Sequence, residues 1–359
     1  MKRVFIPGIA FLVSALVVFV PGDAPVDAQN RMTYSVVSSE NGHVALGLAI
    51  RKLSVSGTFM QAPAHPDDET NALFALFTHG MGLRSIDVQN NRGEGGQNEI
   101  GQELFRDIGV LRTSELVAAH RIDGAEQYFT RAIDYGYSFD PEEVINKWGR
   151  DAIIDDYVRL IRSLRPEVLV TMNIHGRGGD RAHEATTVLV REAYRVAGNP
   201  AMYPEQISEG LRAWQPRKLY FNAGAGVIGA GGRGGRGAAG TPGNPPASPA
   251  PLVPPAQPAF RVTRVNTATY DELLGRTYAE IGADAHSNHK CQGTSGLPAL
   301  PGFATGRGGG GGGQYALMDS TIPGQMQKGE TAIFDDIDVT LYGVAQFAGA
   351  NPPDRRPRS

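Results

Sequence analysis

Apolar runs and amphipathic stretches alternate along most of the chain. Compact apolar runs predict strands at residues 58–62, 166–172 and 218–221, and polar and apolar alternation predicts another at residues 84–89. Between them, apolar residues at helical spacing predict helices at residues 44–53, 71–78, 99–108, 113–122, 151–164 and 181–196, with a further helix opening at Glu142. Residues 338–347 are expected to form a last strand or strand and turn. This alternation predicts an α/β fold with a mostly parallel sheet and helices on both faces.

The first 28 residues have the pattern of an export signal. Lys2 and Arg3 precede an apolar run over residues 4–20, and the small residues at 26–28 match a signal-peptidase site. The run is short and interrupted for a membrane span, which makes an uncleaved anchor the weaker alternative. We therefore expect an exported chain, periplasmic or extracellular, with no stable membrane span after cleavage.

Composition limits the partners and divides the chain. A net charge of −3 argues against nucleic-acid binding, and Cys291 is the only cysteine, so no intrachain disulfide can form. Glycine and proline cluster in two segments that cannot bury enough apolar surface to fold alone. The expected divisions are a signal peptide at 1–28, a core at 29–222, a disordered insertion at 223–259, the rest of the same domain at 260–347 with a glycine-rich loop at 306–313, and a loose tail at 348–359.

Residues that can bind a metal follow two of the predicted strands. The first strand leads directly into Ala-His-Pro-Asp-Asp-Glu at residues 64–69. At the carboxyl end of a parallel sheet, one carboxylate can bind a metal while its neighbour faces water, and mixed imidazole and oxygen ligands suit zinc. The alternative is that Asp68 caps the next helix. The strand ending at Met172 is followed by His175 and His183, and His183 is the better third ligand because the first turn of a helix is rigid.

Several stretches together resemble the PIG-L/LmbE family of zinc-dependent N-acetylglucosaminyl deacetylases, in its exported bacterial subclass. They are residues 64–69, Arg-Gly-Glu-Gly-Gly-Gln-Asn at 92–98, 111–116, 123–130 and 134–138. The resemblance implies a Rossmann-like α/β fold, Zn²⁺ as cofactor, and removal of an acetyl group from an N-acetylated amino sugar or glycoconjugate.

The resemblance also implies roles for single residues. It makes His65, Asp68 and His183 the zinc ligands and Asp67 the general base that activates the attacking water. Asp180 stands where the family has the first histidine of a His-x-x-His element, which steadies the oxyanion or protonates the leaving amine. His175, His286 or His289 can take over that task.

Further residues are expected to contact substrate. They are Arg92, Glu94, Asn98 and His289. For Arg92, a turn in which it pairs with Glu94 or Glu99 is an equal alternative. Arg112 and Glu115, one helical turn apart, are expected to form a structural pair.

Two rival functions remain open at this stage. The substitution of Asp180 for histidine favours a non-catalytic sugar- or metal-binding protein on a decayed deacetylase scaffold. A hydrolase of another amide, such as a mycothiol-like thiol conjugate, is the third possibility.

Overall fold

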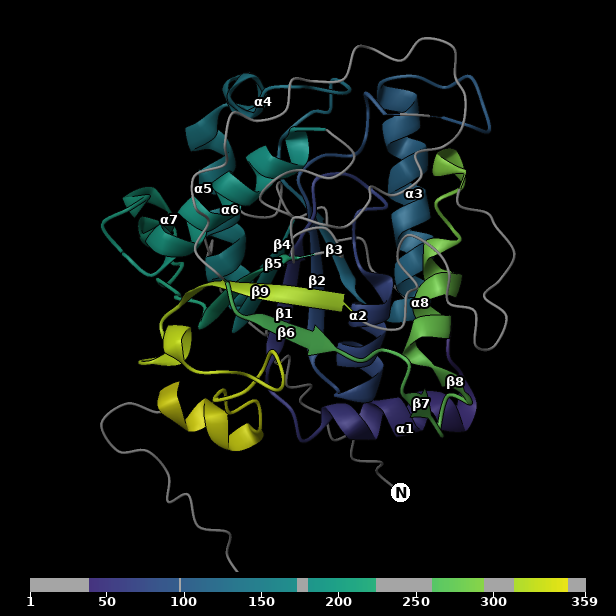
Figure 1. The fold of residues 1–359 in the computed structure, drawn as a ribbon, viewed down its shortest axis with the longest axis vertical. Helices are drawn as coiled ribbons and strands as arrows, with labels where there is room; N and C mark the ends of the chain where they lie inside the picture. The colour runs from purple at the N-terminus through teal and green to yellow at the C-terminus, as the bar shows by residue number, and fades with distance from the viewer. Residues whose placement is uncertain (1–38, 97, 173–179, 224–259, 294–312, 348–359) are drawn as a thin grey trace, which may run out of the picture. The chain divides into compact units, whose positions relative to one another are not determined.

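The computed structural model describes residues 39–96, 98–172, 180–223, 260–293 and 313–347 (Figure 1). Within them a seven-stranded sheet has the order β3-β2-β1-β4-β5-β9-β6. Its strands are β1 (Thr58–Ala62), β2 (Arg84–Gln89), β3 (Glu126–Phe129), β4 (Val168–Thr171), β5 (Lys218–Asn222), β6 (Val262–Val265) and β9 (Gly313–Ser320). β7 (Tyr270–Asp271) and β8 (Arg276–Thr277) form a separate small hairpin.

The first five strands of the sheet are parallel. β1 pairs with β2 on one side and β4 on the other, and β3 and β5 extend the sheet outward. β9 runs antiparallel between β5 and β6. The strand order therefore reverses between β1 and β4, the position at which open α/β sheets place their ligands. The expectation of a Rossmann-like, mostly parallel α/β fold is confirmed.

Helices connect these strands and flank the sheet. The α-helices are α1 (Gly42–Lys52), α2 (Asn71–Ala75), α3 (Arg106–Asp123), α4 (Pro141–Trp148), α5 (Arg150–Leu164), α6 (Ala182–Ala197), α7 (Pro204–Ser208) and α8 (Tyr278–His286). Short helices of other types are the π-helical η2 (Leu76–Gly80) and the 3-10 helices η3 (Lys290–Gln292), η4 (Gln325–Gln327) and η5 (Leu341–Phe347). None of the described helices is long and apolar enough to cross a bilayer.

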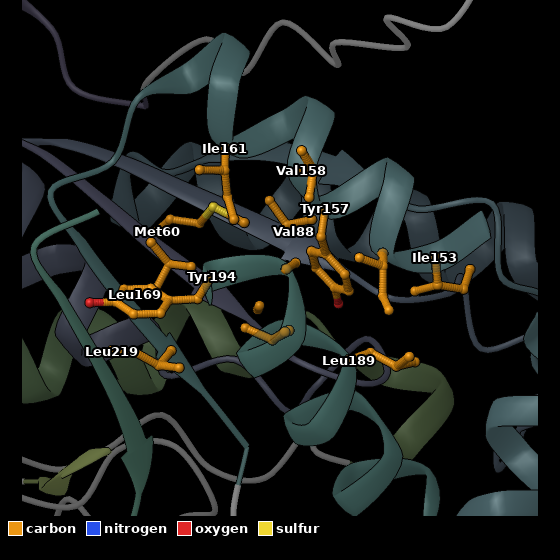
Figure 2. Close-up of a cluster of buried hydrophobic side chains, with 14 of the residues drawn as sticks. Met60, Val88, Ile153, Tyr157, Val158, Ile161, Leu169, Leu189, Tyr194 and Leu219 are labelled. Atoms are coloured by element: carbon orange, nitrogen blue, oxygen red, sulfur yellow. The ribbon is translucent and has the colours of Figure 1, made fainter. Parts of the chain in front are cut away.

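Alternate residues of each strand feed two separate apolar layers. Met60 of β1 and Leu169 of β4 face α5 and α6, where they pack with Tyr157, Ile161 and Leu189 (Figure 2). Their strand neighbours enter the opposite cluster with α2 and η2; these are Phe59, Val168 and Val170. A parallel strand that is buried on both faces has a nearly continuous apolar sequence, and this is why these strands could be predicted from the sequence.

Two expected elements differ in the structure. Residues 99–108 and 113–122 were predicted as two helices, but one helix, α3, begins at Arg106. The preceding apolar side chains face solvent, with Phe105 72% exposed and its φ at +52°, so no buried face supports an earlier helix. Residues 338–347 do not form a strand: Thr340 makes one isolated bridge to Val55, and η5 follows.

The C-terminal segments join the same sheet as the core. β6 and β9 come from residues beyond 260, and Gly313, at the end of the predicted glycine-rich loop, opens β9. The predicted signal peptide, the insertion after Ala223, residues 306–312 and the tail lie outside the described residues. Their predicted properties stay predictions.

Candidate metal centre

The carboxyl end of β1 and the first turn of α6 bring three metal-binding side chains together. His65 and Asp68 lie in the turn after β1, and His183 lies in the first turn of α6. Each offers one ligand atom, and these atoms all lie within 4.8 Å of one another. Oδ2 of Asp68 is 3.2 Å from Nδ1 of His65 and 3.2 Å from Nε2 of His183.

This spacing fits a zinc-sized ion. Bonds of about 2.0–2.1 Å to a tetrahedral ion place neighbouring ligand atoms about 3.3 Å apart. The two distances to Asp68 match that separation without movement of the backbone. Two imidazoles and one carboxylate are also the protein ligands of known catalytic zinc sites, which leave the fourth position to water or substrate. His65, Asp68 and His183 are therefore able to hold a divalent metal.

The alternative reading of Asp68 as a helix cap is wrong. The α2 helix begins at Asn71, its N-cap residue is Thr70, and no side chain caps it. Oδ2 of Asp68 instead accepts the backbone N–H of His65 at 3.0 Å and faces both imidazoles. Although burial opposes its charge, His183 and His65 hold the pKa of Asp68 well below its usual range.

Two more carboxylates face His65 from the other side. Nε2 of His65 is 4.0 Å from Oδ1 of Asp134 and 4.0 Å from Oδ2 of Asp180. Burial favours the neutral imidazole, but the hydrogen bond to Asp68 and the charges of Asp134, Asp68 and Asp180 raise the pKa of His65 to about 9. The field at this point is strongly negative, as a cation-binding site requires.

Asp134 is a site residue that the sequence reasoning missed. The sequence predicts no role for Asp134 beyond its place in residues 134–138, which resemble the family. In the structure it follows the end of β3 on the same edge of the sheet as His65. A backbone hydrogen bond from Asp134 to Oε2 of Glu94, 3.1 Å long, fixes its position. The strand-end rule that found His65 would have found it had β3 been predicted.

Asp67 has the environment expected of a general base. Burial and the charge of Asp68 raise its pKa to about 6, while Arg112, whose Nη2 is 3.8 Å from its Oδ1, opposes the rise. Arg112 also donates to the carbonyl oxygens of Pro66 and Gly93. Arg112 thus supports the turn that carries Asp67.

The predicted pairing of Arg112 with Glu115 is wrong, because these two residues bind different parts of the chain. Oε1 of Glu115 accepts the backbone N–H of Cys291 at 2.8 Å. The spacing of one helical turn made a local pair plausible, but Arg112 is buried and both side chains bind the backbone of distant segments instead.

The residues expected to bind substrate organise the loops around the site. The Arg92 guanidinium lies 3.8 Å over the ring of Phe129 and donates to Thr113, while Glu94 accepts the backbone N–H of Arg92. Oδ1 of Asn98 accepts two backbone N–H groups of the following turn. These contacts hold the rim in shape, and a role in substrate binding stays a prediction.

Three histidines are candidates to replace the histidine that the family has at position 180. His175 lies outside the described residues. His289 is fully buried and its Nε2 lies 2.5 Å from Oε1 of Glu69. His286 bonds Asn71 through Nδ1 at 3.1 Å. Neither described histidine lies among the ligand atoms around Asp68, so their predicted substitution for the family histidine stays a prediction.

Fold and site together define an α/β protein with a candidate metal centre and a flanking carboxylate at the switch point of its sheet. Residues 60–194 match the model of the PIG-L family, which is described as GlcNAc-PI de-N-acetylase. The match spans His65, Asp67, Asp68, Asp134 and His183.

The chain is also similar to a curated protein and to solved structures. Over 179 residues the chain is 30% identical to mycothiol S-conjugate amidase of Streptomyces coelicolor, a match covering 46% of this chain and 60% of the amidase. Among solved structures, an N,N'-diacetylchitobiose deacetylase of Pyrococcus horikoshii aligns with a TM-score of 0.39 and 14% identity, over 50% of this chain and 64% of that enzyme. A conserved protein of Thermus thermophilus aligns with a TM-score of 0.37 and 18% identity, over 67% of this chain and 84% of the other. The chain thus spans less than two thirds of the amidase and of the deacetylase.

Proposed function

We propose that this protein is a zinc-dependent N-deacetylase that hydrolyses the acetamide of an N-acetylated amino sugar or glycoconjugate. The observation that carries the proposal is the convergence of His65, Asp68 and His183 beside Asp67. The match to the PIG-L family model and the amidase relative support amide hydrolysis as the reaction class. The N-terminal pattern adds the proposal that the enzyme acts outside the cytoplasm.

Each residue of the site has a chemical task in this proposal. Zn²⁺ held by His65, Asp68 and His183 would polarise the acetyl carbonyl and lower the pKa of water to about 7. Asp67 accepts the proton that water loses as its oxygen attacks the carbonyl carbon. A pKa near neutrality suits this step, because the carboxylate is ionised before attack and still basic enough to take the proton.

The second half of the reaction expels the amine. The C–N bond breaks only once nitrogen is protonated, and the proton gained by Asp67 can be delivered there, so that acetate and a free amine are formed. Asp180, which stands where the resemblance places the family's histidine, has its Oδ2 4.0 Å from Nε2 of His65. Asp67 thus serves as base and then as acid, and the family histidine is not required for proton balance.

The test is hydrolysis by metal-free and zinc-reloaded protein, in which release of a free amine reports cleavage of any amide and release of acetate reports deacetylation. The substrates are N-acetylglucosamine, N,N'-diacetylchitobiose and an N-acetylcysteine conjugate amide that represents the thiol-conjugate alternative. We expect Asp67→Asn to lower kcat by about 10²–10⁴-fold while the protein keeps its zinc. Asp156→Asn, which changes an acid bound to Arg131 on the surface, is the matched control.

Three results would contradict the proposal. One is equal turnover with and without zinc, and another is full activity in Asp67→Asn. The third is glycan binding without turnover on any substrate, which would favour the non-catalytic alternative instead.

A further inference from the structure

A buried ion pair between His289 and Glu69 contacts the backbone of Asp67. Nε2 of His289 is 2.5 Å from Oε1 of Glu69, and their side chains are 0% exposed. Glu69 belongs to the turn after β1, whereas His289 follows α8, 220 positions further along the chain. The contact therefore ties the C-terminal half of the domain to the turn that carries Asp67.

A metal ion does not explain this pair. Glu69, His286 and His289 have ligand atoms within 4.8 Å of one another, so a second metal site deserves consideration. Ligand atoms on one tetrahedral zinc ion lie about 3.3 Å apart, however, and 2.5 Å is too short for Glu69 and His289 to share one. The close approach is instead that of a charge-assisted hydrogen bond, the class in which N–H···O contacts are shortest.

The other oxygen of Glu69 reaches the backbone of Asp67. Oε2 accepts the N–H of Asp67 at 2.9 Å and the side-chain amide of Gln89 at 3.1 Å. The φ of Asp67 is +98°, a backbone conformation that residues other than glycine rarely adopt. Such strain persists only where surrounding contacts hold it in place. Glu69 supplies such a contact, and His289 fixes the orientation of Glu69.

We propose that His289 is a positioning residue for Asp67 and acts through Glu69. The proposal rests on the proposed function, in which Asp67 is the base. It gives His289 a role other than the predicted contact with substrate, because a side chain with no exposed surface offers substrate nothing to touch. Glu69 and His289 together hold the Asp67 backbone in the conformation that sets the direction of its carboxylate.

Two substitutions at His289 separate the hydrogen bond from the rest of the side chain. Leucine fills the space without a donor, whereas the amide of glutamine can still donate to Glu69. For His289→Leu we expect a fall in kcat of about 10–100-fold, the usual effect of losing a residue that orients the reacting groups. KM should stay within about twofold, zinc content should be unchanged, and His289→Gln should recover most of the loss.

Three further measurements make the test specific. His79→Gln is the control, because His79 is also buried and hydrogen-bonded, to the carbonyl of Ile122, away from the metal centre. Backbone hydrogen exchange should be faster across residues 64–70 in His289→Leu and unchanged there in His79→Gln. Glu69→Ala should reproduce the loss in kcat, and the Glu69→Ala, His289→Leu double variant should lose little more, since both act along one path.

Several outcomes would overturn the proposal. A raised KM at constant kcat would make His289 a substrate contact, and loss of zinc would make it part of the metal site. Exchange across residues 64–70 equal to that of His79→Gln would reduce it to a structural residue. If the unaltered protein hydrolyses no amide, the proposed function fails, and hydrogen exchange alone decides whether His289 holds the Asp67 turn.

Discussion

Gly95 marks the closest approach of two loops beside the metal centre. A Cβ atom at Gly95 would lie 2.1 Å from the nitrogen of Gly136, and 2.5 and 2.8 Å from the C and Cα atoms of Tyr135. All three are backbone atoms and cannot swing aside. Since real Cβ contacts are not shorter than 3.0 Å, Gly95→Ala must push the loops apart by about 0.9 Å.

The displacement would reach the metal centre through a short path. The displaced loop starts at Asp134, whose Oδ1 lies 4.0 Å from Nε2 of His65, and Glu94 joins the two loops through the backbone N–H of Asp134. A shift of about 1 Å in groups that position a reaction costs roughly 10²-fold in rate. We therefore expect Gly95→Ala to lower kcat by about 10²-fold, and to destabilise the fold by about 1–3 kcal/mol, the usual cost of overpacking.

The assay is steady-state acetate release together with thermal unfolding. Gly329→Ala is the matched control, because Gly329 is exposed and its Cβ would meet only Nη1 of Arg261, at an ordinary contact distance of 3.8 Å. It should keep nearly full activity and stability. Wild-type kcat in Gly95→Ala would show that the spacing of these loops does not matter to the chemistry, and the reasoning would fail.

Two stability predictions concern buried charges away from the metal centre. Burial raises the pKa of Glu167 to about 7, so the folded state holds its proton more tightly than the unfolded state does; its stabilising contribution is complete below about pH 4.5 and is lost as pH rises through 7. Glutamine can still accept the N–H of Thr58, so the stability of Glu167→Gln relative to wild type should rise over this range by up to about 3 kcal/mol, and a parallel pH dependence in denaturant titrations would refute this. Lys218 is fully buried and donates to Glu330 at 2.5 Å, so Lys218→Met should cost about 3–5 kcal/mol in the same titrations. Lys147→Met, which removes an exposed ion pair, should leave the midpoint unchanged, and equal effects from the two lysine variants would contradict the reasoning.

Local pattern was sufficient for the parallel half of the sheet. β1, β4 and β5 are compact, mostly apolar runs because both of their faces are covered, and β2 shows polar and apolar alternation. The helices between these strands have clear amphipathic spacing. β3 was not predicted because it has only four residues, half of which are polar. β9 escaped for a different reason: it pairs with β5 and β6 across long stretches of sequence, and no local periodicity reports such pairing.

The candidate site divides in the same way. His65, Asp67 and Asp68 could be predicted because they follow β1, a recognisable strand. His183 could be predicted because it lies in the first turn of the helix that follows β4, a second recognisable strand. The residues around them depend on tertiary structure alone. Arg112 comes from a helix whose start was misplaced, and its contacts with the turn after β1 leave no trace in its neighbours along the chain.

The conformation of Asp67 explains why so many of these unpredicted contacts meet at one turn. A φ of +98° in a residue with a side chain costs of order 1–3 kcal/mol, and the Asp67 turn alone cannot supply that energy. Arg112 donates a hydrogen bond to the carbonyl of Pro66, the residue before Asp67, and Glu69 accepts a hydrogen bond from the N–H of Asp67 itself. These supports start from α3 and, through His289, from the segment after α8, so the angle of the carboxylate is set by the assembled domain. The motif after β1 therefore provides the chemical groups, whereas their working geometry exists only once the distant halves of the chain have packed together.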